Sequence, residues 1–86
     1  MPYKFEAEVR LNESRDVVWS WLLDSDDERV LRLEMSREYL EDHYGTHWSN
    51  RREVAATFSK ERTKYLARAE AAAKVGVPVV QILNRQ

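Results

Sequence analysis

Apolar side chains recur at every second position from Tyr3 to Leu11, and charged residues stand between them. A period of two is typical of a strand with one buried face and one face in water. The stretches 17–23 and 29–35 are predicted to be the second and third strands, and short polar turns separate all three segments. We therefore expect three antiparallel strands joined as a meander.

After Met35 the apolar spacing changes to the three- and four-residue period of a helix. A short helix is predicted from Ser36, whose hydroxyl can cap it, to Tyr44, with Gly45 ending it. Its buried face is expected to include Tyr39, Leu40, His43 and Tyr44.

A long helix is predicted from Ser49 to Val75. Ser49 and Asn50 are both suitable N-caps, and Gly76 can close the C-terminus in a left-handed conformation. The apolar stripe comprises Val54, Phe58, Tyr65, Leu66, Ala69, Ala72 and Ala73. We expect this stripe to cover the strand face that carries Trp19 and Trp21.

The β-branched run Val77–Leu83 predicts a fourth strand, placed at an edge because Pro78 cannot donate to a ladder. The whole chain, residues 1–86, is expected to be one α+β domain. Its predicted architecture is an antiparallel sheet of three or four strands with a short helix and a long helix on one face.

Composition narrows the function classes. The chain has no cysteine, which excludes disulfides and thiolate chemistry, and it has only two glycines, too few for a phosphate-binding loop. There is no apolar stretch of membrane-spanning length and no signal-peptide core at the N-terminus, so we expect a cytoplasmic protein.

Charge is unevenly distributed although the total is only −1. Residues 1–50 carry six Lys and Arg against twelve Asp and Glu, whereas residues 51–86 carry eight against three. A nucleic-acid-binding face is one interpretation. We favour the other, in which the acidic half packs beside the basic half of the same chain or of a symmetric partner.

The middle of the chain resembles the bacterial proteins grouped as "domain of unknown function 1488". The likeness rests on the strand pair, on Val30-Leu31-Arg32-Leu33-Glu34-Met35-Ser36 leading into Glu38-Tyr39-Leu40-Glu41-Asp42-His43-Tyr44-Gly45, and on Phe58 and Arg62 in the following helix. The resemblance implies a small α+β fold and carries no catalytic residues with it.

The sequence offers little support for catalysis or metal binding. His43 and His47 have the four-residue spacing of a helical zinc pair, but Gly45 between them breaks the helix. The chain has no nucleophile-elbow motif, and so short a domain rarely encloses a substrate pocket. We therefore predict no enzyme activity, no catalytic or metal-binding residues and no cofactor.

Four residues are candidates for partner contact. Trp48, Arg51 and Arg52 combine the residue types that dominate protein interfaces. Arg62 falls within the apolar arc of the long helix, where a guanidinium must extend past the apolar stripe to water or meet a carboxylate. A third interpretation is that it binds an anionic ligand at the edge of a cleft. We favour an internal pair with one of four acids in the preceding segment: Glu34, Glu38, Glu41 or Asp42.

The function predicted from these observations is a non-catalytic accessory or protein-interaction domain that self-associates. The alternative is a nucleic-acid-binding module that uses the basic row Lys60, Lys64 and Arg68 on the long helix. The acids interspersed along that helix favour a solvated face instead.

Overall fold

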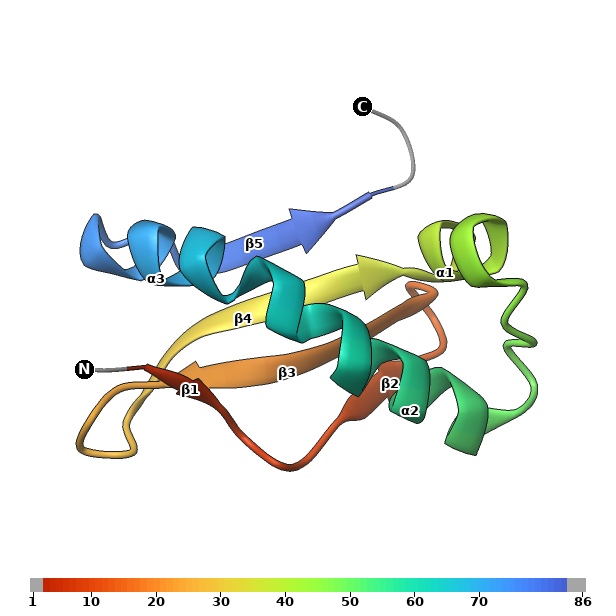
Figure 1. The fold of residues 1–86 in the computed structure, drawn as a ribbon, viewed down its shortest axis with the longest axis horizontal. Helices are drawn as coiled ribbons and strands as arrows, with labels where there is room; N and C mark the ends of the chain where they lie inside the picture. The colour runs from red at the N-terminus through yellow and green to blue at the C-terminus, as the bar shows by residue number, and fades with distance from the viewer. Residues whose placement is uncertain (1–2, 84–86) are drawn as a thin grey trace.

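A computed structural model describes residues 3–83 and confirms the α+β class. One sheet of five strands is covered on one face by helices (Figure 1). The strands are β1 (Lys4–Phe5), β2 (Arg10–Asn12), β3 (Val17–Leu23), β4 (Arg29–Ser36) and β5 (Val79–Ile82). The helices are α1 (Arg37–Tyr44), α2 (Arg51–Arg62), the 3₁₀ turn η1 (Thr63–Tyr65) and α3 (Leu66–Lys74).

The sheet is antiparallel except for its last pairing. Its order is β1-β3-β4-β5, with β2 also paired to β3, and β5 runs parallel to β4. The prediction of a wholly antiparallel sheet is therefore wrong at this position. The chain leaves the end of β4 through α1 and returns along the long helix, so β5 starts again at the beginning of β4. One helical return of this kind gives a parallel strand.

The predicted first strand is divided into β1 and β2. Six residues separate Lys4 from Arg10, whereas four separate their partners Leu23 and Trp19, so two extra residues loop out between the strands. Between β1 and β2 the Glu6 carboxylate accepts a hydrogen bond of 2.7 Å from the backbone N–H of Trp21. Because the excess is an even number, the inward-facing residues keep to one face on both sides of the gap.

The core lies between the helices and the sheet. The side chains of Val18, Ser20 and Leu22 on β3 are fully buried there, with Leu31, Leu33 and Met35 of β4 beside them. The prediction that the long helix covers Trp19 and Trp21 is wrong: both tryptophans project from the opposite face and are only half-buried. We call this second surface the helix-free face. It carries Trp19, Trp21, Arg32, Glu34, Val79 and Gln81.

The predicted helix ends are confirmed. The Ser36 hydroxyl accepts from Tyr39 N–H at the start of α1, and Asn50, one of the two predicted caps, accepts from Glu53 N–H at the start of α2. Gly45 and Gly76 have φ of 64° and 82°, the left-handed conformation expected after a helix. The long helix runs from Arg51 to Lys74 rather than from Ser49 to Val75, and the 3₁₀ turn η1 interrupts it.

The predicted stripe of the long helix does face the sheet. Val54, Phe58 and Ala69 are fully buried, and Tyr65, Leu66, Ala72 and Ala73 pack against the same core. On α1, Tyr39 and Leu40 are buried as predicted, whereas His43 and Tyr44 are exposed.

Replacing Phe58 with alanine should lower the free energy of unfolding by about 3–5 kcal/mol, because the side chain is fully buried. Lys60→Ala on the exposed side of α2 is the matched control and should change stability by less than about 0.5 kcal/mol. Urea denaturation followed by circular dichroism measures both. Equal losses in the two variants would contradict this placement of the helix.

Candidate functional site

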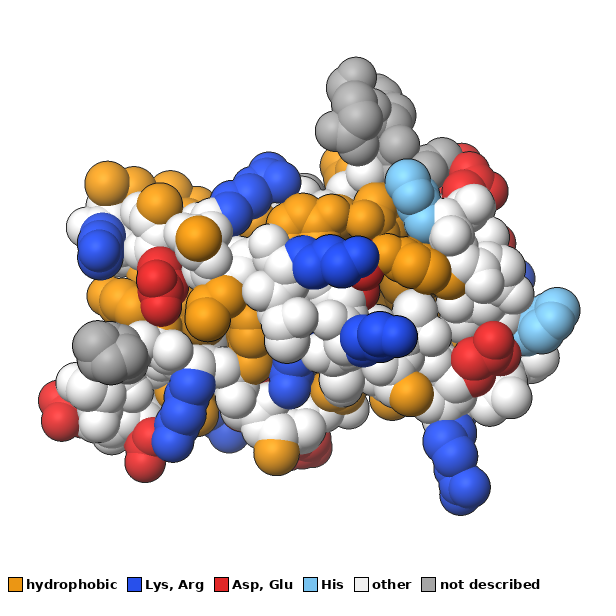
Figure 2. All heavy atoms as spheres, in the orientation of Figure 1, with side chains coloured by type: hydrophobic (Ala, Val, Ile, Leu, Met, Phe, Trp, Pro, Cys, Tyr) orange, Lys and Arg blue, Asp and Glu red, His pale blue; other side chains and the backbone are white. Residues whose placement is uncertain are grey.

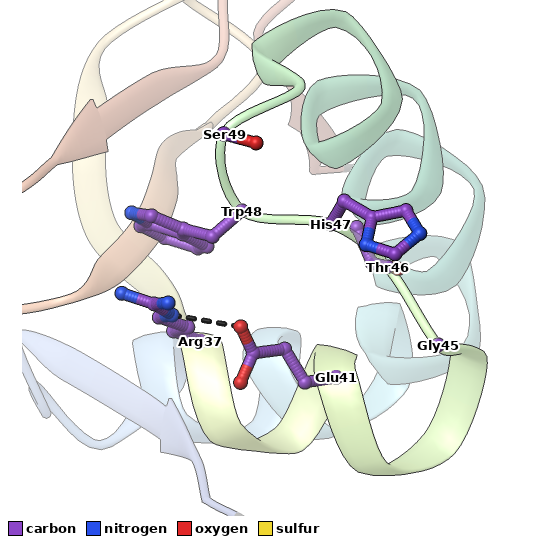
Figure 3. A pocket seen from close by; sticks show the side chains of 7 residues that line it. All are labelled: Arg37, Glu41, Gly45, Thr46, His47, Trp48 and Ser49. Carbon is purple, nitrogen blue, oxygen red and sulfur yellow. Dashed lines mark hydrogen bonds and ion pairs between the residues drawn. The ribbon is translucent and has the colours of Figure 1, made fainter.

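The predicted contact residue Trp48 lines a hollow of about 400 Å³ between α1 and the loop that leads to α2. Its indole lies against the Arg37 side chain, with the guanidinium carbon 5.7 Å from the ring centroid (Figure 3). Arg37 is itself held by Glu41 at 2.8 Å. Trp48 is half-buried against the hydrophobic core. Its large surface is therefore partly used within the fold.

The next two candidates begin α2. Arg51 forms an ion pair with Glu13 in the turn after β2, and Arg52 is exposed. Trp48, Arg51 and Arg52 thus lie at the N-terminal end of the long helix, where Trp48 contacts Arg37 and Arg51 contacts Glu13. Arg62 lies at the other end of α2 and does not belong to this group.

Arg62 is 9% exposed and lies between α2 and the sheet. Its Nη1 donates to the hydroxyl of Ser20 at 2.9 Å, and its guanidinium carbon lies 5.1 Å from the ring centroid of Phe5 and 5.7 Å from that of Phe58. Burial lowers the pKa of Arg62, and the negative charge of Glu6 partly offsets that effect. The side chain still carries its charge at neutral pH.

The predicted carboxylate partner for Arg62 is wrong. Glu34 is on the opposite face of the sheet, where it binds Arg15 and Arg32, and Glu41 binds Arg37. A neutral hydroxyl from β3 takes their place. The signal in the sequence was Ser20 itself, a lone polar residue between Val18 and Leu22 on an apolar strand face.

A buried carboxylate, which the sequence did not single out, joins α1 to the long helix. Glu61 is 4% exposed. It accepts a hydrogen bond from the Tyr44 hydroxyl and forms an ion pair with Lys64, in which Nζ lies 3.0 Å from Oε2. Burial acts to raise the pKa of Glu61, but the bonds from Tyr44 and Lys64, with the charges of Lys64 and His43, outweigh it, so the pKa lies below its usual value. Glu61 is therefore ionised at neutral pH.

Aromatic side chains surround this carboxylate. The hydroxyls of Tyr39 and Tyr65 are 2.7 Å apart, and the His43 ring centroid lies 4.3 Å from that of Tyr39. Figure 2 shows hydrophobic side chains, a class that includes tyrosine there, gathered between α1 and the long helix. Burial and the bond to Tyr65 raise the pKa of Tyr39, which keeps its hydroxyl neutral at physiological pH. The cluster is suited to joining helices rather than to proton transfer.

The predicted basic row of the long helix is exposed at Lys60, Lys64 and Arg68. Lys64 is engaged with Glu61, so part of its charge is balanced inside the domain. A phosphate backbone would have to compete for this cation.

The helix-free face holds a second buried carboxylate. The Glu34 side chain is 3% exposed, and its oxygens lie 2.8 Å from Arg32, 3.3 Å from Arg15 and 3.2 Å from the Gln81 side-chain amide. These residues line an open depression of about 520 Å³ beside β5. Both arginines are thereby held in fixed positions on the face.

Among residues 3–83, no strand other than β4 pairs with β5, so the outer edge of β5 has backbone groups without a strand partner. The Pro78 carbonyl accepts from Arg32 N–H at 3.0 Å, and alternate residues of a strand direct their backbone groups to opposite sides. The backbone groups of Pro78, Val80 and Ile82 therefore point toward β4. The backbone N–H and C=O groups of Val79 and Gln81 point the other way, out from the edge of the sheet.

Among residues 3–83, no group of three His, Asp or Glu side chains is arranged to hold a metal ion. Within the same residues, no helix has the length and apolar character needed to cross a membrane.

Comparison with protein-family models, curated proteins and solved structures gives no match to this chain. The resemblance to domain of unknown function 1488 stays a prediction from the sequence.

The bond between Arg62 and Ser20 can be tested by a double-mutant cycle in urea. Ser20→Ala should lower the free energy of unfolding by about 1–3 kcal/mol, because a buried guanidinium loses its hydrogen-bond acceptor. Adding Arg62→Met removes the stranded charge, and the double variant should be at least as stable as Ser20→Ala alone. Strictly additive losses would contradict a direct bond.

The Glu61 carboxylate should contribute to stability in a pH-dependent way. Its pKa is lower in the folded chain, so its contribution is present above the unfolded-state pKa, about 4.3, and is lost as pH falls through the folded-state pKa. Thermal unfolding of Glu61→Gln should therefore depend less steeply on pH between about 5 and 3 than that of the wild type. Glu38→Gln, at an exposed position of α1, is the control and should retain the wild-type slope.

Proposed function

We propose that this chain is a non-catalytic interaction domain that self-associates through the outer edge of β5. Two copies of β5 would pair antiparallel about a two-fold axis and extend the sheet from one protomer into the other. The observation that carries the proposal is the difference between the two edges of the sheet.

The edge formed by β1 and β2 is poorly suited to pairing. It consists of strands of two and three residues, interrupted by the outward loop and by the charged pair Glu6–Arg10. Short, broken and charged strands are common means of preventing edge-to-edge association. The β5 edge has no such interruption between Val79 and Ile82.

The apolar side chains that flank β5 support a second copy as the occupant. Val77 is 38% exposed and Leu83 is 45% exposed. If the two-fold axis passes beside Val80, the outward backbone groups of Val79 meet those of Gln81 in the other copy. The same register sets Val77 opposite Leu83, so each apolar side chain covers the other.

The remaining site residues are consistent with a binding rather than a catalytic role. The buried carboxylates Glu34 and Glu61 are each neutralised by cations of the same domain, which leaves neither of them free to act as a base. The hollow at Trp48, with Arg51 and Arg52 close by in the chain, is proposed as a secondary contact surface. Its residue types are those of protein interfaces.

The dimer is tested by a proline at Gln81. Gln81→Pro removes an N–H that points away from β4, so the ladder inside the protomer is retained while the proposed pairing loses a donor. Gln81→Ala is the matched control, because it removes the side-chain bond to Glu34 but keeps the backbone N–H. Light scattering at high micromolar concentration should give a dimer mass for the wild type and for Gln81→Ala, and a monomer mass for Gln81→Pro.

Two results would contradict this proposal. One is a monomer mass for the wild type across the concentration range. The other is an undiminished dimer in Gln81→Pro, which would place the contact on another surface.

A further inference from the structure

The helix-free face carries an unusual set of side chains for a surface left open to solvent. Trp19 and Trp21 are neighbours on the central strand β3, with ring centroids 5.4 Å apart and their planes nearly perpendicular. The guanidinium carbons of Arg10 and Arg32 lie 5.1 and 4.1 Å from the ring centroid of Trp19. That of Arg29 lies 5.6 Å from the ring centroid of Trp21.

Carboxylates set below the surface hold two of these arginines, Arg10 and Arg32, in place. The Glu34 side chain is 3% exposed and binds Arg15 and Arg32, which are 49% and 29% exposed. The Glu6 side chain is 12% exposed and binds Arg10, which is 25% exposed. In these pairs the cation is nearer to solvent than the acid, whereas Arg10 also pairs with Glu8, whose side chain is 67% exposed. A ligand approaching the part of this face around Glu34 therefore meets the guanidinium groups of Arg15 and Arg32 first, and these groups have already lost much of their conformational freedom.

We propose that the helix-free face binds single-stranded nucleic acid. An indole ring presents a flat surface on which a base can stack, whatever the base is. Guanidinium groups stack on bases and also form paired hydrogen bonds to phosphate oxygens. The two tryptophans stand two residues apart on one strand, about 7 Å, so the surface accommodates roughly two or three adjacent nucleotides.

Trp21 is the principal stacking residue in this proposal. Trp19 is flanked by two arginines that are fixed by Glu6 and Glu34, whereas the ring of Trp21 is approached by Arg29, which is exposed. A base can displace Arg29 from the ring, and the released guanidinium can then bind the adjoining phosphate. Charge complementarity thus favours an anionic, aromatic ligand over a neutral protein surface.

This site is separate from the basic row of the long helix and from the β5 edge. Lys60, Lys64 and Arg68 belong to the helices on the other side of the sheet, and within residues 3–83 no aromatic ring stacks on these three cations. Pairing through β5 would leave the helix-free face of each copy open.

The test is fluorescence anisotropy of a labelled oligothymidylate of about ten nucleotides, titrated with the full chain at about 50 mM salt. The wild type should bind, and the affinity should fall steeply as salt rises to about 200 mM. Trp21→Leu keeps an apolar side chain but removes the stacking surface, and it should weaken binding at least fivefold or so. Arg29→Gln changes an exposed side chain and should both weaken binding and reduce the salt dependence by about one phosphate contact.

The matched control is the double variant Lys60→Gln, Arg68→Gln on the opposite side, which should retain most of the affinity. Absence of binding by the wild type at low salt would overturn the proposal. So would loss of binding in the helix variant with none in Trp21→Leu or Arg29→Gln. Equal competition by a polyglutamate of the same charge would also overturn it, because that polymer has no bases to stack.

Discussion

The packing of one long helix across one face of the sheet is the constraint on which the rest of this fold depends. Val54 and Phe58 of α2 and Ala69 of α3 fill the space above β3 and β4 and are fully buried. A chain this short can bury only a limited apolar surface, and much of that surface lies in this one layer. The opposite face of the sheet must then be shielded in another way. It is covered by arginine stems and indole rings, whose polar parts remain in contact with water.

The same helix determines how the sheet is completed. It carries the chain from the end of β4 back to the start of β4, so the last strand is parallel to its neighbour. A meander of short turns would have made it antiparallel. The hydrophobic pattern of the final strand cannot distinguish these outcomes, because the alternation of side chains is the same in both directions.

Local signals in the sequence were sufficient for the elements and their ends. Ser36, Asn50, Gly45 and Gly76 act through their own backbone and side-chain chemistry, so their roles follow from the residue types alone. The orientation of β3 did not follow in this way, since both of its faces are apolar. The sequence suggested that the bulkier pair, Trp19 and Trp21, would be buried. The structure buries the face of Ser20 instead.

Arg62 and Ser20 show why side-chain partners were harder to predict than elements. Each is a single polar residue on an otherwise apolar surface, forty-two positions apart in the sequence, and each needs the other to be satisfied. Searching for a carboxylate near Arg62 along the chain could not find a hydroxyl on a strand across the core. Two isolated polar positions on facing apolar surfaces are the more informative signal. For Glu34 it was the burial that was hard to predict. This acid lies on the face of β4 that no helix covers, yet the arginines that bind it bury its side chain.

The two-residue excess between β1 and β2 has a consequence for how this edge can vary in length. A strand side chain changes face with every residue, so removing or adding one residue between Phe5 and Arg10 would turn either Phe5 or Leu11 out of the core. Changes of two residues would preserve both contacts. Length variation at this edge should therefore be tolerated in even steps, and the loop can lengthen or shorten without disturbing the helix that packs behind it.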